Sequence, residues 1–210
     1  MKNYYVAIEG VIGVGKTTLA RLLKPLLQAD MLLEVFEENP FLARFYQDRE
    51  RYAFQTQIFF LLSRFRQQHE AIPAALERGN LVSDYTFDKN MIFARLTIEG
   101  DELEMYERVQ EILAGRIPTP DLVVYLRANV DTLMERITLR DRTYERSMDR
   151  SYIESLASAY DRYFDSSRAA NVLTIETDGL DYVHHADALE AVAAQVRERL
   201  SETAYQAKLL

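Results

Sequence analysis

A glycine-rich segment near the N-terminus has the residue types and spacing that suit phosphate binding. Residues 10–18 read GVIGVGKTT and match the pattern G-x-x-x-x-G-K-[ST]. Glycines let backbone N–H groups curl around a phosphate, and the following helix N-terminus adds the positive end of its dipole. Lys16 would reach the β and γ oxygens of a nucleoside triphosphate, and the Thr17 hydroxyl would bind Mg²⁺. The residues expected to contact this nucleotide are Gly10, Gly13, Val14, Gly15, Lys16, Thr17 and Thr18.

A second magnesium ligand is expected at the end of a neighbouring strand. The segment LVSD, residues 81–84, provides it, because Asp84 follows three residues of strand character. An aspartate at such a place also commonly caps the next helix. With a phosphate-binding loop in the same chain, we interpret Asp84 as linked to the magnesium ion.

Three carboxylates lie in or directly after the second apolar run: Glu34, Glu37 and Glu38 in LLEVFEENP. A carboxylate here would take a proton from an attacking hydroxyl, because phosphoryl transfer mainly requires positioning, charge neutralisation and an oriented nucleophile. Spacing alone does not choose among the three, and a solvated acidic turn is the alternative for Glu37 and Glu38. An acidic site also favours a neutral hydroxyl acceptor over a phosphorylated one.

An arginine cluster lies at the end of a predicted helix in LMERITLRDRTYE. Arg136 and Arg140 are four residues apart and therefore share a helix face, and Arg142 follows closely. Arginine has a permanent charge and a fork geometry that matches phosphate oxygens. A solvated charged face is the alternative, but the preceding motifs favour an arginine-rich lid, around residues 136–148, that closes over the phosphates.

These side chains need a scaffold, and the apolar pattern predicts one with alternating strands and helices. Such alternation indicates an α/β fold with a parallel sheet covered on both faces and with ligands at the carboxyl ends of the strands. The predicted strands are residues 4–8, 31–36, 81–84, 122–126 and 172–176. The predicted helical segments, some of which would contain more than one helix, are residues 16–28, 41–77, 88–114, 129–141, 149–169 and 185–200.

Composition restricts the classes of protein and partner. The 210 residues, without a flexible linker, predict one domain over residues 1–210. The net charge of -8 argues against a nucleic-acid partner. The sequence has no cysteine, no signal-peptide pattern and no apolar run long enough for a membrane span, so we expect a cytoplasmic protein without a membrane partner. The segment 55–65 is apolar around most of its circumference, which fits either a core helix or one buried against a second subunit.

The chain resembles the bacterial deoxynucleoside kinases, in particular the deoxyguanosine and deoxyadenosine kinase branch. The resemblance rests on GVIGVGKTT, EVFEENPFLARFY, FQTQIFFLLSRFRQ, SDYTFDKNMIFA, PTPDLVVYLRA and RITLRDRTYE, in this order. It implies the P-loop kinase fold with a five-stranded parallel sheet and a homodimer. It also implies transfer of the γ-phosphoryl group of ATP, with Mg²⁺, to the 5′-hydroxyl of a deoxynucleoside, for nucleotide salvage.

The resemblance also implies roles for individual residues. Glu34 matches the general base, and Tyr46 with Glu145 matches the pair that holds the sugar 3′-hydroxyl. Gln57 matches the amide that reads the base edge, and Arg64 would face the base pocket. Lys16, Asp84, Arg136 and Arg140 are the further catalytic candidates, and Arg140, Arg142 and Asp178 would bind ATP, the last through the loop TDGLD.

Tyr85 departs from the family pattern, in which an arginine often follows the carboxylate at the end of the third strand. Tyrosine cannot supply that fixed positive charge. Asp84-Tyr85 is typical of the deoxyguanosine kinase branch, and we place Tyr85 among the substrate-binding residues. It would either donate a hydrogen bond to the substrate hydroxyl or pack in the pocket.

Other functions fit the sequence less well. A nucleotide-switch GTPase would normally carry the motif Asn-Lys-x-Asp, which is missing, and the arginine cluster with Glu34 argues against a non-catalytic ATP-binding module. A nucleoside monophosphate kinase such as thymidylate kinase would need arginine where this chain is acidic. A purine deoxynucleoside, deoxyguanosine or deoxyadenosine, is the expected substrate, and a deoxypyrimidine nucleoside is the alternative, because Gln57 can pair with adenine, guanine or cytosine.

Overall fold

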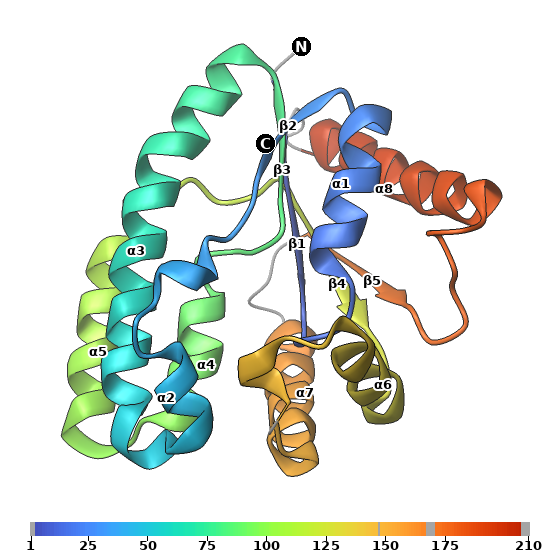
Figure 1. Cartoon of the computed structure of the whole chain (residues 1–210). Helices are drawn as coiled ribbons and strands as arrows, with labels where there is room; N and C mark the ends of the chain where they lie inside the picture. The colour runs from blue at the N-terminus through green and yellow to red at the C-terminus, as the bar shows by residue number, and fades with distance from the viewer. Residues whose placement is uncertain (1–2, 147, 167–170, 207–210) are drawn as a thin grey trace.

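Five parallel strands form one sheet in the order β2-β3-β1-β4-β5. The computed structural model describes residues 3–146, 148–166 and 171–206 (Figure 1). The strands are β1 (Tyr5–Gly10), β2 (Ala29–Leu32), β3 (Asn80–Ser83), β4 (Leu122–Arg127) and β5 (Val172–Glu176). The central strand β1 is buried along its whole length, as expected for a parallel strand with both faces covered.

Helices cover both faces of this sheet. In Figure 1, α1 and α8 lie on one side of the sheet, and α3, α4 and α5 lie on the other. The α-helices are α1 (Lys16–Leu26), α2 (Leu42–Gln47), α3 (Arg49–Arg78), α4 (Lys89–Thr97), α5 (Gly100–Ala114), α6 (Val130–Arg140), α7 (Arg150–Asp165) and α8 (Ala186–Gln206). Two short 3-10 turns, η1 (Phe36–Glu38) and η2 (Thr143–Glu145), border the carboxyl end of the sheet. None of the described helices is both long and apolar enough to cross a bilayer.

The second predicted strand differs most from the observed one. The sequence predicted a strand over residues 31–36, whereas β2 pairs with β3 only from Ala29 to Leu32. The last backbone bond of the pair runs from the Asp84 N–H to the Leu32 carbonyl oxygen. Beyond it the Asp84 carboxylate accepts the Glu34 N–H at 2.8 Å, so this N–H does not continue the ladder. Glu34 therefore lies in the loop that follows β2. The bounds of the other four strands agree with the predicted bounds within two residues at each end.

Two long predicted helical segments are each divided in the structure. The segment 41–77 becomes α2 and α3 because the Asp48 side chain caps α3, accepting the Arg51 N–H at 3.2 Å. The segment 88–114 becomes α4 and α5, with Gly100 at a positive φ of 60° at the junction. Residues 167–169 of the predicted helix 149–169, residue 147 of the predicted lid and both ends of the predicted domain 1–210 lie outside the described residues.

An aromatic cluster packs α7 against strand β4 of the sheet. The ring of Tyr125 on β4 stacks on the ring of Phe164, with the ring centroids 4.5 Å apart. The ring of Tyr160 stacks on that of Tyr125 with the centroids 6.2 Å apart. Tyr160 and Tyr125 are almost fully buried. Such packing stabilises the core and holds the carboxyl end of β4 rigidly beside the phosphate-binding loop.

Candidate active site

The predicted phosphate-binding loop connects β1 to α1. Gly10 has a φ of 146°, and a side chain there would collide with the backbone of Leu126. Gly13 has a φ of 89°, and a Cβ atom would lie 2.9 Å from the Leu133 carbonyl oxygen. Glycine is therefore required at both positions, because only glycine combines these φ values with such close approach of other backbone.

The Lys16 side chain folds back over this loop. Its ammonium donates to the carbonyl oxygens of Gly10 at 2.8 Å and Val11 at 3.0 Å. Burial and the neighbouring positive charge of Lys89 lower the pKa of Lys16 to about 8. The ammonium thus lies in the turn where the loop would hold an anion, and the charge of that anion would offset the charge of Lys16.

Thr17 and Asp84 meet at the carboxyl end of the sheet. The Thr17 hydroxyl donates to Asp84 Oδ2 at 2.5 Å, and Asp84 Oδ1 accepts the Glu34 N–H. A hydroxyl and a carboxylate oxygen side by side match the donor set that Mg²⁺ prefers. These two residues, predicted from the phosphate-binding loop and from the end of the third strand, therefore fit a magnesium ion bound together with a triphosphate.

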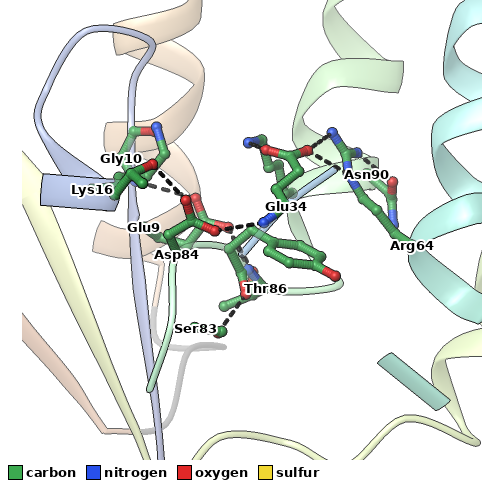
Figure 2. Close-up of polar contacts among 12 residues, drawn as sticks. Glu9, Gly10, Lys16, Glu34, Arg64, Ser83, Asp84, Thr86 and Asn90 are labelled. Atoms are coloured by element: carbon green, nitrogen blue, oxygen red, sulfur yellow. Dashed lines mark hydrogen bonds and ion pairs between the residues drawn. The ribbon is translucent and has the colours of Figure 1, made fainter. Parts of the chain in front are cut away.

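Glu34 lies in the middle of a charged network (Figure 2). Arg64 donates to Glu34 Oε1 from Nε at 2.8 Å and from Nη2 at 2.5 Å, and Lys89 donates to Glu34 Oε2 at 2.6 Å. Burial alone would raise the pKa of Glu34, but the Arg64 and Lys89 charges hold it well below the usual range of a glutamate. Glu34 is therefore ionised and able to accept a hydrogen bond from a hydroxyl.

A cavity of about 240 Å³ opens beside Glu34. It is lined by the predicted acceptor residues Tyr46, Gln57, Arg64 and Glu145, together with Lys16, Thr17 and Asp84 of the phosphate side. Gln57 Oε1 and Thr56 Oγ1 are buried in its wall with no hydrogen-bond partner among the described residues. Because buried polar atoms are nearly always paired, these two oxygens indicate where a polar ligand would bind.

A second, larger cavity of about 760 Å³ lies on the other side of the phosphate-binding loop. Its wall includes Asp178 and the chain that follows it to His184, which contains most of the segment TDGLD. Both carboxylate oxygens of Asp178 accept the Asn129 N–H, at 2.9 and 3.1 Å. The Asp178 side chain therefore anchors the loop to the start of α6.

Three predicted lid arginines divide into two groups. Arg136 lines the larger cavity, but its guanidinium donates to the Val14 carbonyl oxygen at 3.2 Å and to Thr177, so it ties the phosphate loop to the end of β5. Arg140 and Arg142 line both cavities and pair with Glu145 at 2.6 and 3.6 Å. These two arginines lie where the donor and acceptor sides meet.

Tyr85 is not among the described residues that line the cavity beside Glu34. Its side chain is fully buried, and its hydroxyl donates a hydrogen bond to Gln67 Oε1. Side chains of successive residues in an extended chain point in opposite directions, so Asp84 faces the phosphate site and Tyr85 faces α3. The structure thus gives Tyr85 a packing position and gives no support to a direct substrate contact.

Sequence reasoning missed two charged residues at this site, Lys89 and Glu9. Glu9 is fully buried at the end of β1 and accepts hydrogen bonds from the N–H groups of Gly10 and Thr86 and from the hydroxyls of Thr86 and Tyr160. Burial raises the pKa of Glu9, while the Lys89 and Lys16 charges oppose the rise. The sequence did contain a signal for Glu9, because a carboxylate there ends the apolar run YYVAI immediately before the glycine-rich loop.

Replacing Glu9 by glutamine is expected to destabilise the protein by about 1–3 kcal/mol, or roughly 3–10 °C in Tm. In either orientation, the new NH₂ group faces a backbone N–H, that of Gly10 or that of Thr86, and neither can turn away. Thermal unfolding at neutral pH measures the effect. Tyr160→Phe, which removes one hydroxyl 3.2 Å from the same carboxylate, should cost less. Equal Tm values for wild type and Glu9→Gln would contradict the prediction.

Comparisons with known proteins agree with this geometry. The sequence matches the family model described as deoxynucleoside kinase over residues 6–201. The deoxyguanosine kinase of Bacillus subtilis is 36% identical over 199 residues, which cover 92% of this chain and 96% of the relative. The deoxyadenosine/deoxycytidine kinase of Bacillus subtilis is 30% identical over 203 residues, which cover 93% of this chain and 92% of the relative.

A solved structure confirms the expected architecture. Deoxyadenosine kinase from M. mycoides with bound dATP superimposes with a TM-score of 0.79 at 22% identity, covering 93% of this chain and 100% of the other. The five-stranded parallel sheet flanked by helices is thus the P-loop kinase fold predicted from the sequence. With the family match extending over almost the whole sequence, the chain belongs to the deoxynucleoside kinase family.

Proposed function

We propose that this protein transfers the γ-phosphoryl group of ATP to the 5′-hydroxyl of a purine deoxynucleoside, deoxyguanosine or deoxyadenosine, in nucleotide salvage. One observation carries the proposal: two cavities share a wall formed by Lys16, Thr17, Arg140 and Arg142. The larger cavity suits the donor, because it contains the phosphate-binding loop. The smaller suits the acceptor, because it contains Glu34 and the unpaired Gln57 oxygen.

The chemistry follows from the positions of the charged groups. Glu34 accepts the proton of the acceptor hydroxyl while the oxygen of that hydroxyl forms a bond to the γ-phosphorus. The bond from that phosphorus to the bridging oxygen breaks, and ADP leaves with the electron pair. Lys16, Arg140 and Arg142 offset the negative charge on the phosphoryl oxygens. Mg²⁺, which Thr17 and Asp84 would hold, neutralises charge on the β and γ phosphates when bound.

The nature of the acceptor is supported by hydrogen-bonding capacity. Glu34 lines the acceptor cavity as an ionised carboxylate, so it can accept a hydrogen bond from a neutral hydroxyl. The Gln57 amide can donate and accept, so it can read a purine edge. The name of the Bacillus subtilis relative, deoxyguanosine kinase, supports a purine, and a deoxypyrimidine nucleoside is the alternative substrate.

Two properties of the whole protein belong to the same proposal. A homodimer is supported by exposed apolar side chains on the neighbouring helices α3 and α5, namely Leu62, Met105 and Ile112. Leu62 is 52% exposed within the segment 55–65, which fits a helix that packs partly against a second subunit. A cytoplasmic location is supported by the need for ATP as donor.

A phosphorylation assay with ATP and Mg²⁺ tests the function. The acceptors are the four deoxynucleosides, their ribose analogues and their monophosphates. We expect the highest kcat/KM for a purine deoxynucleoside, and no turnover after Mg²⁺ is removed with EDTA. A clear preference for thymidine monophosphate would refute a nucleoside kinase, and a preference for thymidine or deoxycytidine would favour the alternative substrate class.

A further inference from the structure

Lys89 is a buried cation in the wall of the acceptor cavity. It is the first residue of α4, is 6% exposed and lines the acceptor cavity together with Lys16. Burying an ammonium is costly unless a partner offsets its charge. The partner here is Glu34 Oε2, 2.6 Å from Nζ.

Arg64 and Lys89 hold Glu34 in different ways. Arg64 is fixed, because its planar fork donates twice to Glu34 Oε1 and once to Asn90 Oδ1 at 2.6 Å. Lys89 carries a compact ammonium with three donors on a flexible stem, and among the described residues its one hydrogen-bond acceptor is Glu34 Oε2. Lys89 can therefore move without breaking other hydrogen bonds of the described structure, whereas Arg64 cannot.

The oxygen held by Lys89 is the one that an acceptor hydroxyl needs. Glu34 Oε1 is already occupied by two Arg64 donors, so a hydroxyl that gives its proton to Glu34 must approach Oε2. Lys89 lines the same cavity as Lys16, Thr17 and Asp84 of the phosphate side. Released from Oε2, its ammonium is free to turn into this shared space.

We propose that Lys89 is a catalytic cation: it yields Glu34 Oε2 to the acceptor hydroxyl and contacts the oxygens of the phosphoryl group in transfer. This role rests on the proposed kinase function. The acceptor oxygen bonds to the γ-phosphorus, its proton goes to Glu34, and the bridging P–O bond breaks toward ADP. Lys89 keeps its proton throughout and offsets the charge that develops on the phosphoryl oxygens.

The first test removes the charge and keeps the length of the side chain. Lys89→Met should lower kcat by about 100-fold with the acceptor KM changed less than about threefold, because the contact forms in the transition state. Lys89→Gln keeps an N–H donor for Glu34 Oε2 without the charge. If Lys89 only positions Glu34, the glutamine variant will recover kcat to within about threefold of wild type, which would overturn the proposal.

The second test restores the cation chemically. The chain has no cysteine, so Lys89→Cys introduces a single thiol that 2-bromoethylamine converts to an aminoethyl group with an ammonium at the lysine position. We expect the unmodified variant to lose about 100-fold in kcat and the modified one to regain at least about tenfold. Lys24→Cys, at an exposed position in α1, is treated identically and should keep wild-type kcat before and after modification.

Besides recovery of kcat in Lys89→Gln, two results would refute the role of Lys89: wild-type kcat in Lys89→Met, or no recovery in a fully modified Lys89→Cys protein whose Tm equals that of wild type. A Lys89→Met protein that does not fold leaves the decision to the aminoethylated protein. Failure of the underlying function looks different, because the wild-type enzyme itself would then phosphorylate no deoxynucleoside in the same assay.

Discussion

Glu34→Gln is expected to lower kcat by at least about 100-fold while acceptor binding changes only a few-fold. Glutamine preserves the shape of the side chain and its hydrogen bond to an acceptor hydroxyl, but it cannot take the proton. Arg64 and Lys89 lose their charged partner, so Tm must be measured alongside activity. Steady-state kinetics with varied acceptor at saturating ATP separate kcat from KM.

The pH dependence gives a second readout of the same residue. Because Arg64 and Lys89 hold the pKa of Glu34 well below its usual range, the base stays ionised in mildly acidic solution. We therefore expect kcat/KM to show no Glu34 titration between about pH 5 and 7. The stability from this lowered pKa is fully present above the unfolded pKa of about 4.3 and is lost as pH falls through the folded-state value.

Glu38 provides a matched control. It lies four residues after Glu34, at the end of η1, and its carboxylate is exposed and 3.7 Å from Arg66. Glu38→Gln should therefore keep kcat and Tm close to wild type. Unchanged turnover in Glu34→Gln, or an equal loss in both variants, would remove Glu34 from the role of base.

Sequence reasoning succeeded where the chemistry is local in the chain. The phosphate-binding loop could be predicted because its glycines, Lys16 and Thr17 lie within eight consecutive residues that end one strand and start one helix. Asp84 could be predicted because it directly follows a strand, and parallel strands bring their carboxyl ends to one edge.

The parts that failed depend on contacts between distant segments. Lys89 lies 55 residues from Glu34 in sequence, and no local pattern distinguishes it from a solvated lysine at a helix start. The predicted end of the second strand was wrong because the Asp84 side chain, supplied by another strand, takes the Glu34 N–H. For Tyr85 the sequence left open a hydrogen bond to the substrate or a packing role, and the contact that bears on this choice, with Gln67, comes from a different element, α3.

Lys16→Ala is expected to lower kcat/KM for ATP by at least about 1,000-fold. In the free protein the Lys16 ammonium is held by two carbonyl oxygens of its own loop, so it is placed where phosphate oxygens would bind. Alanine leaves the glycine backbone intact but removes the charge that the β and γ phosphates would meet. Lys24→Ala, on the exposed side of the same helix, is the control and should retain wild-type kinetics.

Proton uptake provides an independent measure of the same contact. The pKa of Lys16 is about 8 in the free protein, below the ordinary value of a lysine, because burial and Lys89 disfavour its charged form. A bound triphosphate favours the charged form and raises this pKa, so wild-type protein should take up protons when ATP binds between about pH 8 and 9. Calorimetric titration in two buffers of different ionisation enthalpy detects this uptake. The proton uptake should disappear in Lys16→Ala and persist in Lys24→Ala. If Lys16→Ala retained both activity and proton uptake, contact between Lys16 and the donor phosphates would be refuted.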